Sequence, residues 1–168
     1  MRVEVFDNVF VGDMEVCSRH EFKPNTAYVH GCKHPCHLEA VGYTGSLPPS
    51  HLYWLHYSRS DMMIDSHELF LNLVDPPSPS LFKKKSFDVF LEYMMGVHVH
   101  GKEVNIHCNE GKSRGPSLAL LYGAKILGEL PNSSYEDAAM AFKKLYRDYE
   151  PAHGISKWLT ANWKQLWS

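Results

Sequence analysis

The sequence predicts an α/β fold, a three-layer sandwich in which helices flank a mainly parallel central sheet. Three features predict it. Short apolar runs typical of buried strands dominate the chain up to residue 74. From residue 86 onward, stretches with apolar residues at helical spacing take over. One more strand-like run, at 104–107, lies between two helical stretches, and strands mixed with helices favour a layered α/β arrangement.

The strands are separated by residues typical of turns. Asp7-Asn8 is a turn pair that divides the first two strands, and Pro76 ends the fourth because proline cannot donate a ladder hydrogen bond. Residues 42–50 are typical of a loop, and 51–57 fit either a strand or a helix. The strands are expected at 3–6, 8–13, 26–30, 68–74 and 104–107.

Helix signals follow in the second half. Pro116 lies in the first turn of one expected helix and Gly128 near its end, which is the usual asymmetry. Ser133 and Glu136 have the spacing of a capping box at the start of the next. The helices are expected at 86–100, 115–128, 133–149 and 155–167.

The composition is that of a soluble globular protein. The chain has 168 residues, 44% hydrophobic and 21% charged, so we expect one domain over residues 1–168 with its own core. The formal net charge of −2 argues against a general nucleic-acid binder and against binding to an anionic membrane surface. We therefore expect neither nucleic acid nor membrane among its partners.

No segment is typical of a membrane span or a secretory leader. No apolar run approaches the roughly 18 residues that a spanning helix needs, and the first residues lack the apolar core of a signal peptide. Four cysteines are too few for a disulfide scaffold in a chain of this size. We expect a cytoplasmic protein with free thiols at Cys17, Cys32, Cys36 and Cys108.

The stretch from Val104 to Tyr122 places a cysteine, a glycine and an arginine between a strand and a helix. A helix N-terminus carries unpaired N–H groups and positive potential, so it binds anions. Gly111 allows a tight loop whose N–H groups point inward, and Arg114 adds a planar, bidentate grip on phosphate oxygens. Such surroundings favour a thiolate at Cys108, which becomes a nucleophile beneath a bound phosphate.

The motif HCNEGKSR at 107–114 resembles the His-Cys-x-x-Gly-x-x-Arg signature of cysteine-dependent tyrosine and dual-specificity phosphatases. The order of elements over roughly residues 3–167 is similar to that of the small dual-specificity phosphatases, with 31–66 the least similar part. The resemblance implies that Cys108 forms a cysteinyl-phosphate, that Arg114 stabilises its transition state, and that His107 supports the thiolate. The residues it places around the substrate are His107, Asn109, Glu110, Gly111, Lys112, Ser113 and Ser117.

Such an enzyme also needs a general acid, because the leaving oxygen must be protonated. The family places an aspartate on a loop just after a strand, upstream of the cysteine. Asp75 directly follows the apolar run 68–74 and is the expected acid, which would later deprotonate the attacking water. Asp61 and Asp65 are the alternatives, although neither directly ends an apolar run.

Gly115 departs from the family pattern. Dual-specificity phosphatases usually carry Ser or Thr after the loop arginine, where the hydroxyl donates a hydrogen bond to the leaving thiolate. This chain has Gly115 there, and Ser117 is the nearest hydroxyl that could take over the role. The departure weakens the expectation of high turnover more than that of phosphate binding.

We predict a phosphomonoester hydrolase that acts on phosphotyrosine, and on phosphoserine or phosphothreonine, in protein substrates. No metal cofactor is expected, because the loop and its arginine supply the electrostatics. Lys112 lies where inositol-lipid phosphatases of this superfamily also carry lysine, whereas Glu110 disfavours multiply phosphorylated head groups. The alternatives are a phosphoinositide or RNA 5′-phosphatase, and a phosphate-binding module with little turnover.

A second group of cysteines and histidines lies at 30–37, HGCKHPCH. Thiolate and imidazole at short spacing bind zinc, but the spacing is not a paired Cys-x-x-Cys and Pro35 restricts the loop. A disulfide between Cys108 and Cys32 or Cys36 is another alternative. We predict instead a loop and helix start whose polar groups line the site or pack locally. The group comprises His30, Cys32, His34, Cys36 and His37, with Cys17 and His20 nearby in the sequence.

Overall fold

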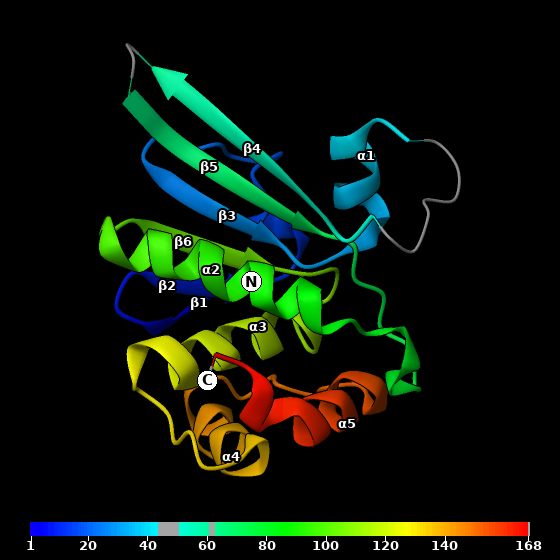
Figure 1. Cartoon of the computed structure of the whole chain (residues 1–168). Coiled ribbons are helices and arrows are strands. Elements are labelled where there is room, and N and C mark those ends of the chain that lie inside the picture. Colours follow the sequence, from blue (N-terminus) through cyan, green and yellow to red (C-terminus); the bar gives the residue numbers. More distant parts are fainter. Residues whose placement is uncertain (44–50, 61–62, 168) are drawn as a thin grey trace.

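A six-stranded mixed sheet forms the centre of the computed structural model, which describes residues 1–43, 51–60 and 63–167, with the backbone alone for 57–60 and 63–66 (Figure 1). The strand order is β1-β2-β6-β3-β5-β4. Their bounds are β1 Arg2–Phe6, β2 Val9–Gly12, β3 Thr26–His30, β4 Tyr53–Ser60, β5 Met63–Leu71 and β6 Glu103–His107.

The four inner strands run parallel to one another. β6 pairs in parallel with β2 and with β3, and β3 pairs in parallel with β5. The two outer strands, β1 and β4, are antiparallel to their neighbours. The mainly parallel sheet predicted from the sequence is therefore confirmed. Because β2, β3 and β6 share a direction, their carboxyl ends meet at one edge, where open α/β sheets carry their sites.

Five α-helices and several shorter turns complete the described part of the chain. The α-helices are α1 Leu38–Val41, α2 Lys84–Val99, α3 Arg114–Tyr122, α4 Tyr135–Leu145 and α5 His153–Asn162. The short 3-10 helices are η1 Met14–Val16, η3 Pro79–Leu81 and η5 Trp163–Gln165. The short π-helices are η2 Lys33–His37 and η4 Gly123–Leu127. Among the described residues, no helix is both long and apolar enough to cross a bilayer.

The two faces of the sheet are covered differently. Successive strand residues point to opposite faces. On β6, Val104 and Ile106 join the large apolar core that includes residues of α2 to α5. Asn105 and His107 alternate with them and are also buried, so they lie on the opposite face. That face is covered by η1, η2 and the short α1, which lies apart from the other helices in Figure 1.

Some predicted boundaries were wrong. The strand expected at 68–74 is β5, which ends at Leu71. The run at 51–57, which fitted either a strand or a helix, falls mostly on its antiparallel partner β4, which begins at Tyr53. The helix cap is Ser134, whose hydroxyl accepts from the Asp137 N–H, because the helix begins one residue later than the capping-box spacing indicated. That helix ends at Leu145 instead of continuing to 149. The expected loop at 42–50 falls mainly on 44–50, outside the described residues.

Candidate active site

Cys108 lies where β6 ends, and α3 begins six residues later at Arg114. The intervening residues 108–113 are called the 108–113 loop below. Cys108 is 2% exposed and therefore lies at the base of this loop, while Glu110 and Lys112 are exposed at its outer side. The arrangement of strand, loop and helix N-terminus is the one that the sequence predicted.

Two glycines let the loop pass close to its surroundings. Gly111 has φ of +71°, and a Cβ there would lie 2.9 Å from the carbonyl carbon of Gly12. Gly115 lies in the first turn of α3, where a Cβ would lie 3.0 Å from the carbonyl carbon of His107 and 3.1 Å from the Cys108 nitrogen. A serine at 115 therefore requires the helix and the base of the loop to move apart by a few tenths of an ångström. Glycine thus fits the close approach of α3 to the base of the loop at this position without displacement.

The segment that leads into α5 holds the loop in shape. The phenol of Tyr146 donates to the Gly111 carbonyl at 2.5 Å. The N–H of Glu150 donates to the Lys112 carbonyl at 2.8 Å, and the N–H of Ala152 donates to the Ser113 hydroxyl at 2.9 Å. These bonds occupy carbonyl and hydroxyl oxygens of the loop. They fix the loop through its oxygen atoms and leave its N–H groups available to a ligand.

The Arg114 guanidinium is oriented by two acceptors. Nη1 donates to the Leu73 carbonyl at 2.9 Å, and Nη2 donates to Oδ1 of Asn109 at 2.6 Å. Asn109 is itself held, because its Nδ2 donates to the His34 carbonyl at 2.8 Å. The arginine side chain is 13% exposed, so it is folded over the loop and not extended into solvent. Asn109, predicted to bind substrate, acts here on Arg114.

Asp75 lies beside this arginine, four residues after the end of β5. Its Oδ2 is 4.0 Å from Arg114 Nε. Its Oδ1 is buried and accepts no hydrogen bond from the part of the chain that is described. Burial raises the pKa of this carboxyl, and the neighbouring Ser113 hydroxyl and Arg114 guanidinium offset part of the rise. A carboxyl that retains its proton is suited to act as an acid.

Comparisons with known proteins agree with this architecture. No protein-family model and no curated protein sequence matches the chain. The structure of human DUSP28 is similar over 99% of this chain and 95% of that chain, with a TM-score of 0.65 and 16% identity. The structure of a human tyrosine phosphatase-like serine/threonine/tyrosine-interacting protein is similar over 95% of this chain and 93% of that chain, with a TM-score of 0.61 and 17% identity. The structure of PTPMT1 in complex with PI(5)P is similar over 98% of this chain and 95% of that chain, with a TM-score of 0.63 and 14% identity.

The chain has the dual-specificity phosphatase fold. At these identities the likeness concerns the fold, so the chemistry must be argued from this chain's own residues. In this dual-specificity phosphatase fold, the predicted Cys108 directly follows β6, Arg114 begins α3, and Asp75 lies in the segment after β5. The side chain of the alternative Asp65 and the whole of Asp61 lie outside the described residues.

Ser117 has a partner of its own within this fold. Its hydroxyl lies 2.8 Å from the phenol of Tyr149, which in turn lies 2.9 Å from that of Tyr135. Burial raises the pKa of the Tyr149 phenol well above its ordinary value, so it stays protonated and remains a hydrogen-bond donor. The Ser117 hydroxyl thus belongs to a buried network between α3 and the C-terminal helices.

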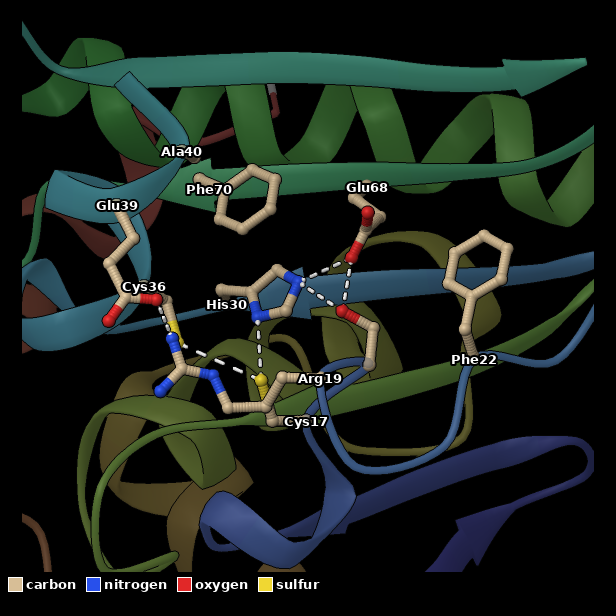
Figure 2. Close-up of a pocket in the computed structure, with 10 residues that line it drawn as sticks. Cys17, Arg19, Phe22, His30, Cys36, Glu39, Ala40, Glu68 and Phe70 are labelled. Carbon is tan, nitrogen blue, oxygen red and sulfur yellow. Dashed lines mark hydrogen bonds and ion pairs between the residues drawn. The ribbon is translucent and has the colours of Figure 1, made fainter. Parts of the chain in front are cut away.

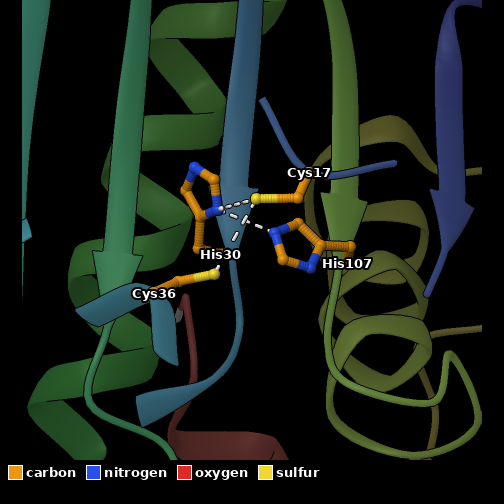
Figure 3. Close-up of side chains that lie close together, drawn as sticks. All are labelled: Cys17, His30, Cys36 and His107. Atoms are coloured by element: carbon orange, nitrogen blue, oxygen red, sulfur yellow. Dashed lines mark hydrogen bonds between the residues drawn. The ribbon is translucent and has the colours of Figure 1, made fainter. Parts of the chain in front are cut away.

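His107 points away from the 108–113 loop, to the second face of the sheet. Its Nε2 lies 2.7 Å from Nδ1 of His30, and its Nδ1 lies 3.2 Å from the Cys108 carbonyl oxygen. It thus contacts the backbone of the nucleophile, although it was predicted to lie among the substrate-binding residues. The structure places it in a buried group with His30, Cys17 and Cys36, which we call the Cys/His cluster (Figure 3).

The Cys/His cluster differs from the group read from the sequence. Cys17 and His30 were recognised with Cys36, but His107 lies 71 positions beyond Cys36 and was assigned to the loop alone. The sequence-based grouping relied on residues that are close in the chain. Such a grouping cannot include His107, which lies on a neighbouring parallel strand. His20 and His34 are exposed, Cys32 is buried beside the cluster, and His37 pairs with His51 at 3.1 Å.

Proposed function

We propose that this protein is a phosphomonoester hydrolase that dephosphorylates proteins through a cysteinyl-phosphate intermediate. The observation that supports the proposal is the 108–113 loop, which joins Cys108 at the end of β6 to Arg114 at the start of α3, with Asp75 Oδ2 4.0 Å from Arg114 Nε. A nucleophile, an anion-binding group and an acid thus come from three separate elements. The fold is one on which phosphatases are built.

In the first step the Cys108 thiolate attacks phosphorus, and an S–P bond forms as the P–O bond to the leaving group breaks. The N–H groups of the loop and the Arg114 guanidinium stabilise the equatorial oxygens, which carry the negative charge. The proton on the Asp75 carboxyl passes to the leaving oxygen. The raised pKa of this carboxyl keeps it protonated to a higher pH than an ordinary aspartate.

In the second step water attacks the phosphoenzyme. An O–P bond forms, the S–P bond breaks, and the Asp75 carboxylate takes the proton of the attacking water. Inorganic phosphate leaves, and the thiolate and the protonated acid are restored. Arg114 contacts the transferred group in both steps, and its hydrogen bonds to Leu73 and Asn109 limit the freedom of its side chain.

Phosphorylated protein is the substrate that the rim of the loop favours. Glu110 and Lys112 are both exposed there, so their charges oppose each other and provide no surface of uniform positive charge. A multiply phosphorylated lipid head group or an RNA 5′ end would gain little from such a rim. A peptide with a single phosphate places one dianion at the base of the loop and needs no basic surround.

A phosphate-binding module with little turnover is the second candidate. Gly115 has no hydroxyl, and the Ser117 hydroxyl is bonded to Tyr149. Neither residue therefore assists the departure of the thiolate in the second step, which would make breakdown of the phosphoenzyme slow. One of the structurally similar proteins is named a tyrosine phosphatase-like serine/threonine/tyrosine-interacting protein.

The test mixes the full chain with an aryl phosphate and follows product on the millisecond scale, with the phosphoenzyme measured by quenching and mass spectrometry. Steady turnover with a transient phosphate on Cys108 supports the hydrolase. A burst of one product per chain followed by a stalled phosphoenzyme supports the binding module. If no cysteinyl-phosphate forms in this experiment, both candidate functions are contradicted. Phosphopeptides and phosphoinositides compared in steady state then define the substrate.

A further inference from the structure

Four buried side chains converge on one point on the face of the sheet opposite α2 to α5. Cys17 follows η1, His30 ends β3, Cys36 lies in η2 and His107 ends β6. One Sγ or ring nitrogen from each lies within 4.8 Å of all the others (Figure 3). Two thiols and two imidazoles are a set of ligands that zinc prefers.

The spacing suits a tetrahedral ion. Zinc with Zn–S bonds of about 2.3 Å separates two sulfur ligands by about 3.8 Å, and a sulfur from an imidazole nitrogen by about 3.5 Å. The sulfurs of Cys17 and Cys36 are 3.8 Å apart, and Cys17 Sγ is 3.7 Å from His30 Nδ1. The 2.7 Å between His30 Nδ1 and His107 Nε2 is shorter than the roughly 3.3 Å that zinc requires, so the two rings must part slightly.

The outer nitrogen of each imidazole faces an acceptor. His30 Nε2 lies 2.9 Å from Oε1 of Glu68, and His107 Nδ1 lies 3.2 Å from the Cys108 carbonyl oxygen. Glu68 is in turn held by the hydroxyl of Ser18. Histidines that bind metal ions almost always donate their other N–H to a carboxylate or a carbonyl. Both histidines of the cluster show this arrangement.

The same contacts decide where the lone pairs point. Because the acceptors require a hydrogen on His30 Nε2 and on His107 Nδ1, neutral rings leave lone pairs on His30 Nδ1 and His107 Nε2. These two nitrogens face each other at 2.7 Å, in a region where both residues are at most 1% exposed. Two facing lone pairs repel unless a proton or a metal ion lies between them. The two sulfurs beside them provide the remaining ligands of a metal ion.

We propose that the Cys/His cluster is a structural zinc site. Two thiolates balance the charge of Zn²⁺, so the interior would bury no net charge from the ion and its ligands. Four protein ligands fill the tetrahedron, which is the pattern of a structural site and not of a catalytic one with an open position. The proposal is independent of the phosphatase reaction, because none of the four side chains supplies a nucleophile, acid or anion-binding group to it.

A pocket of about 360 Å³ gives the ion a route to the site (Figure 2). Cys17, His30 and Cys36 form part of its lining, together with Glu68. An ion pair between the side chains of Arg19 and Glu39 also lies along the pocket. Zinc can therefore reach the cluster from solvent without passing the 108–113 loop.

The ion would connect three segments of the first 37 residues to a distant strand. It would join η1, β3 and η2 to the end of β6, directly before the nucleophile. Little secondary structure covers this face of the sheet, since α1 has only four residues. The buried apolar cluster on this face is smaller than the main core and consists of Cys17, Cys32 and Cys36. Removing the ion should therefore lower the thermal midpoint of unfolding and loosen the base of the loop through His107.

The test measures metal in the full chain, purified without a histidine tag. We expect about one zinc ion per chain. After removal of the metal, titration with Co²⁺ alone should give the intense visible bands of tetrahedral cobalt and a thiolate charge-transfer band in the near ultraviolet. Addition of a strong chelator should lower the thermal midpoint of the zinc form. The wild-type spectrum requires no variant and so does not depend on whether a variant folds.

Matched variants locate the ion. Cys17→Ser and Cys36→Ser should lose zinc, whereas Cys32→Ser, which removes a buried neighbouring thiol outside the cluster, should keep it. Cys108→Ser should also keep it, which separates this site from metal bound at the nucleophile. Sub-stoichiometric zinc with the weak spectrum of octahedral cobalt would overturn the proposal. A Cys17–Cys36 disulfide in protein isolated without reductant, together with no metal, would overturn it as well.

Discussion

His107 and Cys108 are neighbours in the chain, yet they belong to two different sites. Cys108 opens the 108–113 loop, whose components lie within eight residues except for Asp75. His107 faces the other way, toward a cluster drawn from four segments. The loop offers N–H groups, a guanidinium and a helix N-terminus, which suit an anion. The cluster is built of lone pairs and thiols, which suits a cation.

The two sites are stabilised by different means. The loop is held by hydrogen bonds from the Tyr146 phenol and from the N–H groups of Glu150 and Ala152, so it needs no ion to keep its shape. The cluster is held by contacts among its own sulfur and ring-nitrogen atoms, which a bound ion would replace. A change in one site should therefore act mainly on one measurement, either turnover or metal content.

The largest effect is expected for Cys108→Ser. A serine hydroxyl at this position is a poor nucleophile, so hydrolysis of an aryl phosphate should fall by about 10⁴-fold or more. Zinc content should be unchanged, because the sulfur of Cys108 is outside the cluster. Steady-state rates and metal analysis on the same preparation check both statements. Cys32→Ser serves as the matched control and should retain turnover; activity persisting in Cys108→Ser would refute the mechanism.

Asp75→Asn comes next, with an expected loss of about 10²–10³-fold. The loss should be largest for alkyl phosphates, whose leaving groups need the proton most. The wild-type rate should fall as pH rises through the raised pKa of Asp75, because only the protonated carboxyl donates. The variant should lack this limb of the pH profile. An unchanged profile for the variant would mean that another group is the acid.

Glu68→Gln tests the cluster through its outer contact. The amide keeps a hydrogen-bond acceptor for His30 but removes the negative charge, so zinc affinity should weaken by about 10- to 100-fold. Competition with a chromophoric chelator measures it. Glu39→Gln, a change in the lining of the same pocket, is the control and should bind zinc normally. Equal affinity in wild type and Glu68→Gln would argue that this carboxylate does not orient a ligand.

Tyr146→Phe should give the smallest effect. It removes the hydrogen bond to the Gly111 carbonyl, whose net contribution is about 1 kcal/mol, so kcat/KM should fall about fivefold. Zinc content should not change, since Tyr146 is not part of the cluster. A simultaneous loss of zinc would show that the loop and the cluster are coupled more tightly than their separate contacts indicate.

The sequence by itself determined the strand–loop–helix unit that carries Cys108 and Arg114. These residues are close in the chain, and local rules of strand periodicity, glycine conformation and helix termini describe their arrangement. The mainly parallel sheet followed from the order of apolar runs in the same way. The strand boundaries did not follow in the same way: β5 ends at Leu71, the last of its residues that pairs with β4.

Only the tertiary structure decided which distant residues meet. The parallel register places His30 opposite His107, and the turns after β2 and β3 bring Cys17 and Cys36 to them. The structure likewise placed the Ser117 hydroxyl beside the Tyr149 phenol and Gly115 close to the backbone of His107 and Cys108. The physical reason is that strand pairing and face alternation are long-range constraints. Spacing within a short stretch of sequence cannot express them.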